Sequence, residues 1–418
     1  MLSRTMRPLL AEQYSDMLAQ DYRLRNVLLL SYHHTFNDLH RFDNRMLACL
    51  EGMVLLKGEA SEYLRGQLDE ILSVGDLFSV ALFAASTEDE FLLSGCLGLV
   101  QAMPRLLPAL LAVTDWMPAS STLWSLIMGH PACRAHIAVT GNRSSLPITF
   151  SEQEIVTLIE QNQCVAHLLC FLHASGSSLF IPALNMVLSS ERDNIKICGC
   201  RIVLHLSESP GEYIRATNEN LHQFVRSKDK DVRVQAVKYL MIYSSDESSS
   251  VINELAKQEA DTRLLIQAMG WSGLTEYVPL LMSYFDESDY ARLSMLSVSS
   301  ITGSLPEKDG WKKKVEDEPF VKTLSESAEI PVSLPEQGVC WPDVAKFQLW
   351  WQTKRSRFSS RVPYLGGLLS TQENLSTIVA DGVLNLRPLA AMRMKMLPEF
   401  TALPAERQPQ IFTNLSEK

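Results

Sequence analysis

A short segment that recurs about every thirty residues limits most strongly what this 418-residue chain can fold into. Each copy places a lysine or arginine just inside an expected helix, and in three copies Asp or Asn lies two residues earlier. The basic residues are Lys196, Arg233, Arg263 and Arg292, with spacings of 37, 30 and 29 residues. About thirty residues suffice for two helices and two short turns. One such pair cannot bury its apolar face alone, so the sequence predicts pairs that stack around an extended core.

The rest of the chain also has the apolar spacing of amphipathic helices. In residues 64–84, apolar side chains recur three or four residues apart, as they do on one face of a helix. Here we expect one helix to end at Gly75 and the next to begin at Asp76, because glycine favours a C-terminal cap and aspartate an N-terminal cap. Alternating strand patterns are almost absent, and residues 148–150 are the best short exception. The sequence therefore predicts an all-α fold, a solenoid of helix pairs wound into an α-α superhelix.

Composition and charge argue against several classes of partner and compartment. The formal net charge of -10 argues against wrapping nucleic acid, which requires many lysines and arginines to neutralise phosphates. No stretch reaches about 18 uninterrupted apolar residues, as a membrane-spanning helix requires, and the first residues lack the apolar core of a signal peptide. Eight cysteines are scattered through the chain, which is typical of reduced thiols. We therefore expect a cytoplasmic protein without a membrane partner.

Individual repeats resemble known repeat families. Asp231 and Arg233, followed by Ala236, Val237 and Leu240, resemble the signature of the HEAT repeat. The segment 268–281 resembles the shorter HEAT-like repeat of phycobilisome lyases. The small residues in both segments permit close approach of neighbouring helices. The predicted solenoid is therefore of the HEAT-like type.

Two segments near the ends of the chain carry a more specific resemblance. The N-terminal segment covers residues 32–45 and continues with Leu50-Glu51-Gly52. The C-terminal segment includes Trp341-Pro342-Asp343, Trp350-Trp351, Phe358, Arg361, Tyr364-Leu365-Gly366-Gly367, Asp381-Gly382, Arg387 and Ala390-Ala391. Together they resemble a family of bacterial HEAT-repeat proteins often encoded near type VI secretion components, including VgrG and PAAR spike proteins. The resemblance implies an accessory role in that machine, such as effector loading, and transfers no catalytic residues.

The domain boundaries follow from the repeats and from the distribution of proline. Residues 1–58 are expected to form an N-terminal, family-specific helical cap, and residues 59–303 the HEAT-like repeats. Residues 304–343 contain several prolines and a mixed charge run at 312–318, so they read as an insertion or linker, a departure from the family. Residues 344–418 are expected to form a C-terminal helical region with a frayed tail.

The end segments also supply the candidate binding residues. We expect protein-binding roles for Tyr32, His34, Asp38, Arg41, Trp350, Trp351 and Tyr364. His33, His34, Asp38 and His40 could instead form a metal or acid–base cluster, since His34 and Asp38 are four residues apart and could share a helical face. A zinc site usually requires three or four convergent ligands, and the fourth is not evident. Polar residues that fix a cap are the alternative. The tryptophans lie beside several basic residues, so nucleic-acid stacking and simple packing are further alternatives.

Other motifs predict no chemistry. Cys164, His167, Cys170 and His173 are three residues apart, and on one helix they would spread over half of its surface and could not converge on one ion. Gly366-Gly367 is not followed by the Gly-Lys-Ser/Thr of a phosphate-binding loop. The four repeated basic residues could line a concave ligand surface, or they could pair with Asp or Asn of adjacent repeats and fix the register. The sequence therefore predicts no catalytic residue, no metal site and no cofactor.

These features favour a non-catalytic scaffold that binds another protein. The expected partner is a VgrG or PAAR spike protein or an effector, with this chain acting as adaptor or chaperone. Two alternatives belong to other classes. One is a HEAT-like enzyme, such as a chromophore lyase or an alkyl-base DNA glycosylase, and the other is an immunity protein that binds a toxin.

Overall fold

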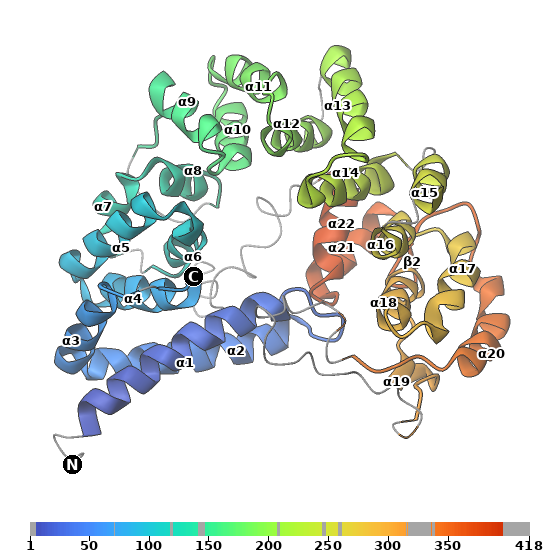
Figure 1. The fold of residues 1–418 in the computed structure, drawn as a ribbon, viewed down its shortest axis with the longest axis horizontal. Helices are drawn as coiled ribbons and strands as arrows, with labels where there is room; N and C mark the ends of the chain where they lie inside the picture. The colour runs from blue at the N-terminus through green and yellow to red at the C-terminus, as the bar shows by residue number, and fades with distance from the viewer. Residues whose placement is uncertain are drawn as a thin grey trace. The chain divides into compact units, whose positions relative to one another are not determined.

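The fold is seen in a computed structural model (Figure 1). It describes residues 6–395 except 71, 118–119, 141–146, 207–209, 245–247, 258–260, 315, 317–335 and 337–338. Most of the predicted insertion and the whole predicted frayed tail therefore lie outside the described residues. The described chain divides into two compact units. One contains the chain up to Leu29 together with His34–Ile202, and the other contains Leu30–His33 and the chain from Val203 onward.

Helices build both units, which confirms the predicted all-α class. The helices of the first unit are α1 (Met6–Leu28), α2 (Phe36–Leu55), α3 (Lys57–Gln67), α4 (Val74–Thr87), α5 (Glu90–Ala102), α6 (Leu107–Trp116), α7 (Trp124–Met128), α8 (Pro131–Thr140), α9 (Glu152–Glu160), α10 (Val165–Ala174) and α11 (Phe180–Leu188), and α12 (Asp193–His205) contains the boundary. Alternate helices pack on one another, α4 on α6, α6 on α8 and α8 on α10, with α5, α7 and α9 along one side of this row (Figure 1).

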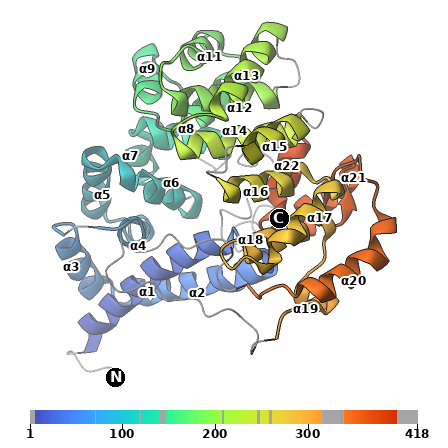
Figure 2. The same cartoon turned by 45° about the vertical axis from the view of Figure 1, so that its right-hand side comes forward.

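The second unit repeats this arrangement and adds a small hairpin. Its helices are α13 (Gly211–Phe224), α14 (Lys230–Tyr243), α15 (Ser248–Lys257), α16 (Thr262–Ser272), α17 (Val278–Ser283), α18 (Ala291–Thr302), α19 (Pro306–Asp309), α20 (Val344–Lys354), α21 (Gln372–Asp381) and α22 (Leu386–Arg393), and its strands are β1 (Tyr364–Leu365) and β2 (Leu368–Leu369). Helices α14, α16 and α18 pack in succession (Figure 2). Residues 148–150 form no strand. The predicted domain boundaries at 58, 303 and 343 remain predictions.

The predicted turn at Gly75 and Asp76 is wrong. Helix α4 begins after Ser73, whose hydroxyl accepts a hydrogen bond from the Asp76 amide, while the Asp76 carboxylate accepts one from the Ser73 amide. Asp76 is therefore the third helical residue of a capping box. Gly75 lies in the first turn, where a Cβ atom would lie 2.5 Å from the Ala19 carbonyl oxygen of α1. The glycine serves close helix packing and does not end a helix.

Buried ion pairs join α1 to α2 in the first unit. Arg25 donates to both carboxylate oxygens of Asp43, at 2.6 and 3.3 Å, and both side chains are almost fully buried. The Arg25 guanidinium carbon also lies 5.5 Å from the centre of the Trp116 ring. Arg45 donates to both carboxylate oxygens of Asp21. Residues 43 and 45 of the N-terminal segment thus fix the helical hairpin.

The described ends of the predicted insertion are packed into the second unit. Trp311 is fully buried, its indole nitrogen donates to the Ser304 hydroxyl at 2.8 Å, and Trp341 is also buried. An isolated antiparallel bridge joins Lys312 to Pro342. The described residues at both ends of the predicted insertion are therefore well packed, although the region contains several prolines and a mixed charge run.

None of the helices in the described ranges is both long enough and apolar enough to cross a bilayer. All eight cysteines lie among the described residues, and none of them is in a disulfide. The thiols of Cys49, Cys96 and Cys133 are buried, and burial raises the pKa of each.

Candidate functional site: a pocket at the C-terminal end of α18

A two-residue hairpin organises the candidate site in the second unit. Strands β1 and β2 pair Tyr364 with Leu369 and Leu365 with Leu368. Gly366 and Gly367 connect them with φ angles of 58° and 81°. Two consecutive positive φ angles characterise a type I′ turn, in which glycine is favoured at both positions.

The hairpin caps the C-terminal ends of two neighbouring helices. The amides of Gly366 and Gly367 donate to the carbonyls of Ser300 and Ile301 in the last turn of α18, at 2.6 and 3.0 Å. The Tyr364 amide donates to the Gly273 carbonyl just after α16, at 2.9 Å. The last carbonyls of a helix have no partner within it. The hairpin therefore satisfies groups that would otherwise require water.

A second cap comes from a guanidinium group. Arg393, at the end of α22, donates to the Tyr364 carbonyl at 3.1 Å, to the Ser370 hydroxyl and to the Trp271 carbonyl of α16 at 2.9 Å. Burial lowers the pKa of Arg393 to about 10, so the side chain remains a cation at neutral pH. A cation at a helix C-terminus interacts favourably with the helix dipole.

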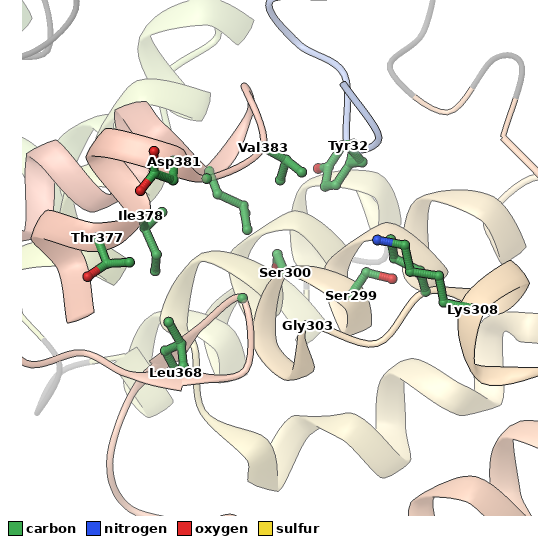
Figure 3. Close-up of a pocket in the computed structure, with 14 residues that line it drawn as sticks. Tyr32, Ser299, Ser300, Gly303, Lys308, Leu368, Thr377, Ile378, Asp381 and Val383 are labelled. Atoms are coloured by element: carbon green, nitrogen blue, oxygen red, sulfur yellow. The ribbon is translucent and has the colours of Figure 1, made fainter. Parts of the chain in front are cut away.

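Beside this hairpin lies a cavity of about 310 Å³ (Figure 3). Its lining is mixed in chemistry and comes from the 30–33 segment, α18, α19, the hairpin, α21 and α22. The lining residues are Tyr32, Ser299, Ser300, Gly303, Leu305, Lys308, Gly366, Leu368, Thr377, Ile378, Asp381, Gly382, Val383 and Leu386. Apolar side chains form the wall, while hydroxyl groups and two opposite charges provide polar contacts. This is the usual composition of a binding pocket.

The charged residues of the pocket are exposed and lie apart. Figure 3 shows Asp381 and Lys308 on opposite sides of the cavity. Neither side chain has an ion-pair partner among the residues that the structure describes. Both charges are therefore open to a ligand that enters the cavity.

Tyr32 brings the N-terminal segment into this pocket. The Ser31 carbonyl accepts a hydrogen bond of 3.3 Å from the Asn385 amide, which fixes the 30–33 segment against the start of α22. Burial raises the pKa of the Tyr32 hydroxyl to about 12, so the phenol remains neutral at physiological pH. Residues from the N-terminal segment 32–45 and from the C-terminal segment thus line one cavity, since Gly366, Asp381 and Gly382 belong to the latter.

The other C-terminal candidates form an aromatic series. The ring of Trp350 stacks on Phe347 and on Trp351, with centroid separations of 5.5 and 6.3 Å. Phe358 continues the series to Tyr364, whose hydroxyl accepts a hydrogen bond from the Ser359 amide at 2.9 Å. Phe347 is fully buried, so the series begins in the core. These aromatic side chains pack on one another, and none of the three candidates lines the pocket.

The remaining N-terminal candidates lie in the first unit. Thr35 precedes α2, and its amide and hydroxyl both donate to the Asp38 carboxylate, at 2.9 and 3.1 Å. These bonds, the backbone one first, lower the pKa of Asp38. His34 lies before the helix, so it does not share a helical face with Asp38, and Arg41 is exposed on α2. The structure assigns Asp38 a capping contact.

The repeated basic residues have different partners. Arg233 pairs with Asp261, the residue that caps α16, at 2.7 Å. Arg263 donates to the Asp289 carbonyl at 3.2 Å and to Glu336. The Arg292 guanidinium lies over Trp341 at 4.7 Å, and Lys196 lies near the start of α12. Arg233 and Arg263 therefore both bind a polar group just before the start of the next helix of the row.

A series of three polar side chains in contact, in the first unit, was not predicted from the sequence. His136 contacts Asp115 through Nε2, at 3.1 Å, and His167 through Nδ1, at 3.3 Å. The three residues come from α6, α8 and α10, so no local motif could reveal them. Cys164 precedes α10 with a φ of 49°, and burial raises the pKa of its thiol to about 12, which disfavours the reactive thiolate. Among the residues described, no group of three or more His, Cys, Asp or Glu could hold a metal ion.

Comparisons of the chain with models of protein families, with curated proteins and with solved structures return no match.

Proposed function

We propose that this chain is a non-catalytic scaffold, built as a HEAT-like helical-repeat solenoid, that binds another protein. By the resemblance of its end segments, the partner is a VgrG or PAAR spike protein or an effector of type VI secretion. The chain would act as an adaptor or chaperone during loading.

The rows of alternate helices support the repeat architecture. In the first unit α4, α6, α8 and α10 form one row, and in the second unit α14, α16 and α18 form another. Each helix of a row contacts the next but one in sequence, as stacked helix pairs do. Such a stack presents side chains from successive repeats to one extended partner.

The pocket at the end of α18 carries the proposal of binding. It joins Tyr32 to Gly366, Asp381 and Gly382, which come from two segments more than 300 residues apart. An apolar cavity rimmed by hydroxyls and charges suits an anchoring side chain of a partner, because buried anchors in pockets dominate many protein interfaces. We therefore place the partner's anchor in this cavity.

Two neighbouring substitutions on α21 test the pocket. Thr377 lines the cavity, whereas Ser376 does not, and both are exposed and donate to the carbonyl four residues earlier. Thr377→Trp should fill the cavity, and Ser376→Trp is its matched control. Tagged full-length variants are to be captured from bacteria with an active type VI system, and co-purifying proteins quantified by mass spectrometry.

Wild type and Ser376→Trp should capture spike or effector proteins. With Thr377→Trp the captured amount should fall at least about tenfold. If wild type captures no component of the secretion system, the proposed function is wrong. If Thr377→Trp captures as much as the control, the function stands and the pocket is not the binding site. A captured toxin that loses its activity would favour the immunity class.

A further inference from the structure

Helix α1 is apolar on two faces. One face, which includes Leu18 and Tyr22, is buried against the rest of the first unit. On the other face Met6, Leu24 and Val27 are 49%, 44% and 46% exposed. A surface helix of a single compact unit usually has one apolar stripe. The second stripe is therefore available to another helix.

The second stripe follows a coiled-coil pattern. Steps of four and three residues alternate along it without interruption. Its members are Met6, Leu10, Gln13, Met17, Gln20, Leu24 and Val27. These are the a and d positions of successive heptads, which form the seam of a two-helix coil. The stripe runs for about 32 Å, at 1.5 Å per residue.

We propose that this stripe binds α1 of a second copy of the chain, in the antiparallel direction. In an antiparallel coil, a positions face d positions of the other helix. Met17 then faces Gln20 of the second copy, and Leu24 faces Gln13 of the second copy. Leu10 and Val27 face each other at both ends, so two apolar contacts flank a more polar centre.

The flanking charges select this direction and register. Asp16 and Arg23 are both exposed and both occupy the g position beside the seam. In the proposed register Asp16 lies beside Arg23 of the second copy, and symmetry creates the same pair twice. A shift by one heptad in either direction would oppose Asp16 to Asp16 or Arg23 to Arg23. A parallel pair would place Asp16 beside Asp21 of the other copy, which is buried and already paired with Arg45, so Asp16 would gain no cationic partner.

Contacts within the unit leave these two charges available. Arg23 reaches Asp76 only at 4.0 Å, donates a long bond of 3.4 Å to the Ala19 carbonyl, and has a side chain that is 56% exposed. Asp16 accepts a long bond of 3.5 Å from the Tyr63 hydroxyl. The two glutamines at seam positions each face Met or Leu of the second copy, which weakens the coil. We therefore expect a reversible dimer.

Cysteine pairs test the register in the full-length protein. Met17→Cys with Gln20→Cys should give an interchain disulfide under mild oxidation, seen as a dimer on a non-reducing gel and mapped by mass spectrometry. Glu12→Cys with Asn26→Cys is the control, because these exposed residues lie at matching heights but off the stripe. Oxidised wild type controls for the eight native cysteines. Equal dimer yields in both pairs would overturn the proposal.

Charge exchange tests the direction independently. Sedimentation velocity should show that Asp16→Arg weakens the dimer by about tenfold, because it places two arginines together. Asp16→Arg with Arg23→Asp should restore most of the affinity, since the pair is only reversed. Circular dichroism checks that each variant is folded. A monomeric wild type at its highest soluble concentration, or a double variant no better than the single one, would contradict the antiparallel α1 contact.

Discussion

The α1–α2 junction of the first unit and the α16–α18 layer of the second unit hold their helices together by different means. At the α1–α2 junction the contact is made by side chains, since Arg25 and Asp43 form a buried bidentate pair. At the α16–α18 layer backbone groups add to the packing, since a hairpin donates its amides to carbonyls in the last turn of α18 and just after α16. Loss of a charged side chain should therefore destabilise the first region most, and replacement of a glycine the second.

The difference also separates the N-terminal segment 32–45 from the C-terminal segment. In the first unit, residues 43 and 45 use their charges inside the helical hairpin, where no ligand is needed to explain them. In the second unit, Gly366 and Gly367 hold the hairpin against α18 and leave a cavity beside it. The N-terminal residues thus hold a helical hairpin together, whereas the C-terminal residues hold the β-hairpin in place and also line a cavity.

The largest effect is expected from breaking the buried ion pair. Arg25→Met removes the partner of a buried carboxylate and should lower the free energy of unfolding by roughly 3–5 kcal/mol. The double variant Arg25→Met with Asp43→Leu removes both charges and should recover most of that loss. Urea unfolding, followed together with hydrogen exchange in α1 and α2, measures both effects.

The pH dependence sharpens this prediction. Burial raises the pKa of Asp43 in the folded protein, despite the opposing effect of Arg25. Without Arg25 the folded state binds a proton at Asp43 more readily than the unfolded state does. The loss in Arg25→Met should therefore be full at neutral pH and shrink as the pH falls through the folded pKa. A loss that stays constant with pH would show that packing, and not the charge, is responsible.

The second effect concerns glycine at the end of α18. Gly303 and Gly310 both have positive φ angles, 70° and 78°, but their surroundings differ. A Cβ atom at Gly303 would lie 2.3 Å from the Gly366 carbonyl oxygen, whereas one at Gly310 meets nothing within 4 Å. Gly310→Ala should cost about 1 kcal/mol from backbone strain alone. Gly303→Ala should cost at least about 2 kcal/mol more, because the hairpin must move.

Thermal unfolding gives the two costs, and hydrogen exchange at the Gly366 and Gly367 amides locates the difference. Exchange at these amides should rise in Gly303→Ala and stay unchanged in Gly310→Ala. Equal costs for both substitutions would mean that the hairpin yields easily, and the contrast with the side-chain junction would then disappear.

The sequence predicted the helices better than their ends and contacts. Apolar spacing identified the all-α class because burial of one helix face imposes it locally. The turn at Gly75 was misplaced because a glycine that permits close packing looks like one that ends a helix. The hairpin was missed, although two glycines between pairs of apolar residues signal a type I′ turn, because two-residue strands are too short to alternate.

The candidate site required the tertiary structure. Tyr32 was chosen from its segment, but its place in the same cavity as Asp381 depends on how α18, α21 and the 30–33 segment pack. The side-chain contacts from Asp115 through His136 to His167 join three helices and leave no pattern in the local sequence. Local spacing reports which side chains share a helix, not which helices share a cavity.

The smallest effect tests whether the N-terminal segment is structural at Asp38. Hydrogen bonds from Thr35 lower the pKa of Asp38 below its ordinary value of 3.8, so its contribution is present above the unfolded pKa and is lost as the pH falls through the folded pKa. Asp38→Ala should therefore cost about 1 kcal/mol at neutral pH and nothing in acid. Asn37→Ala, an exposed neighbour in the same turn, is the matched control and should cost little at any pH. Chemical unfolding of both variants across the acid range measures this difference. A cost for Asp38→Ala that equals the control at neutral pH would remove the capping role, and would leave partner binding as the remaining explanation for that aspartate.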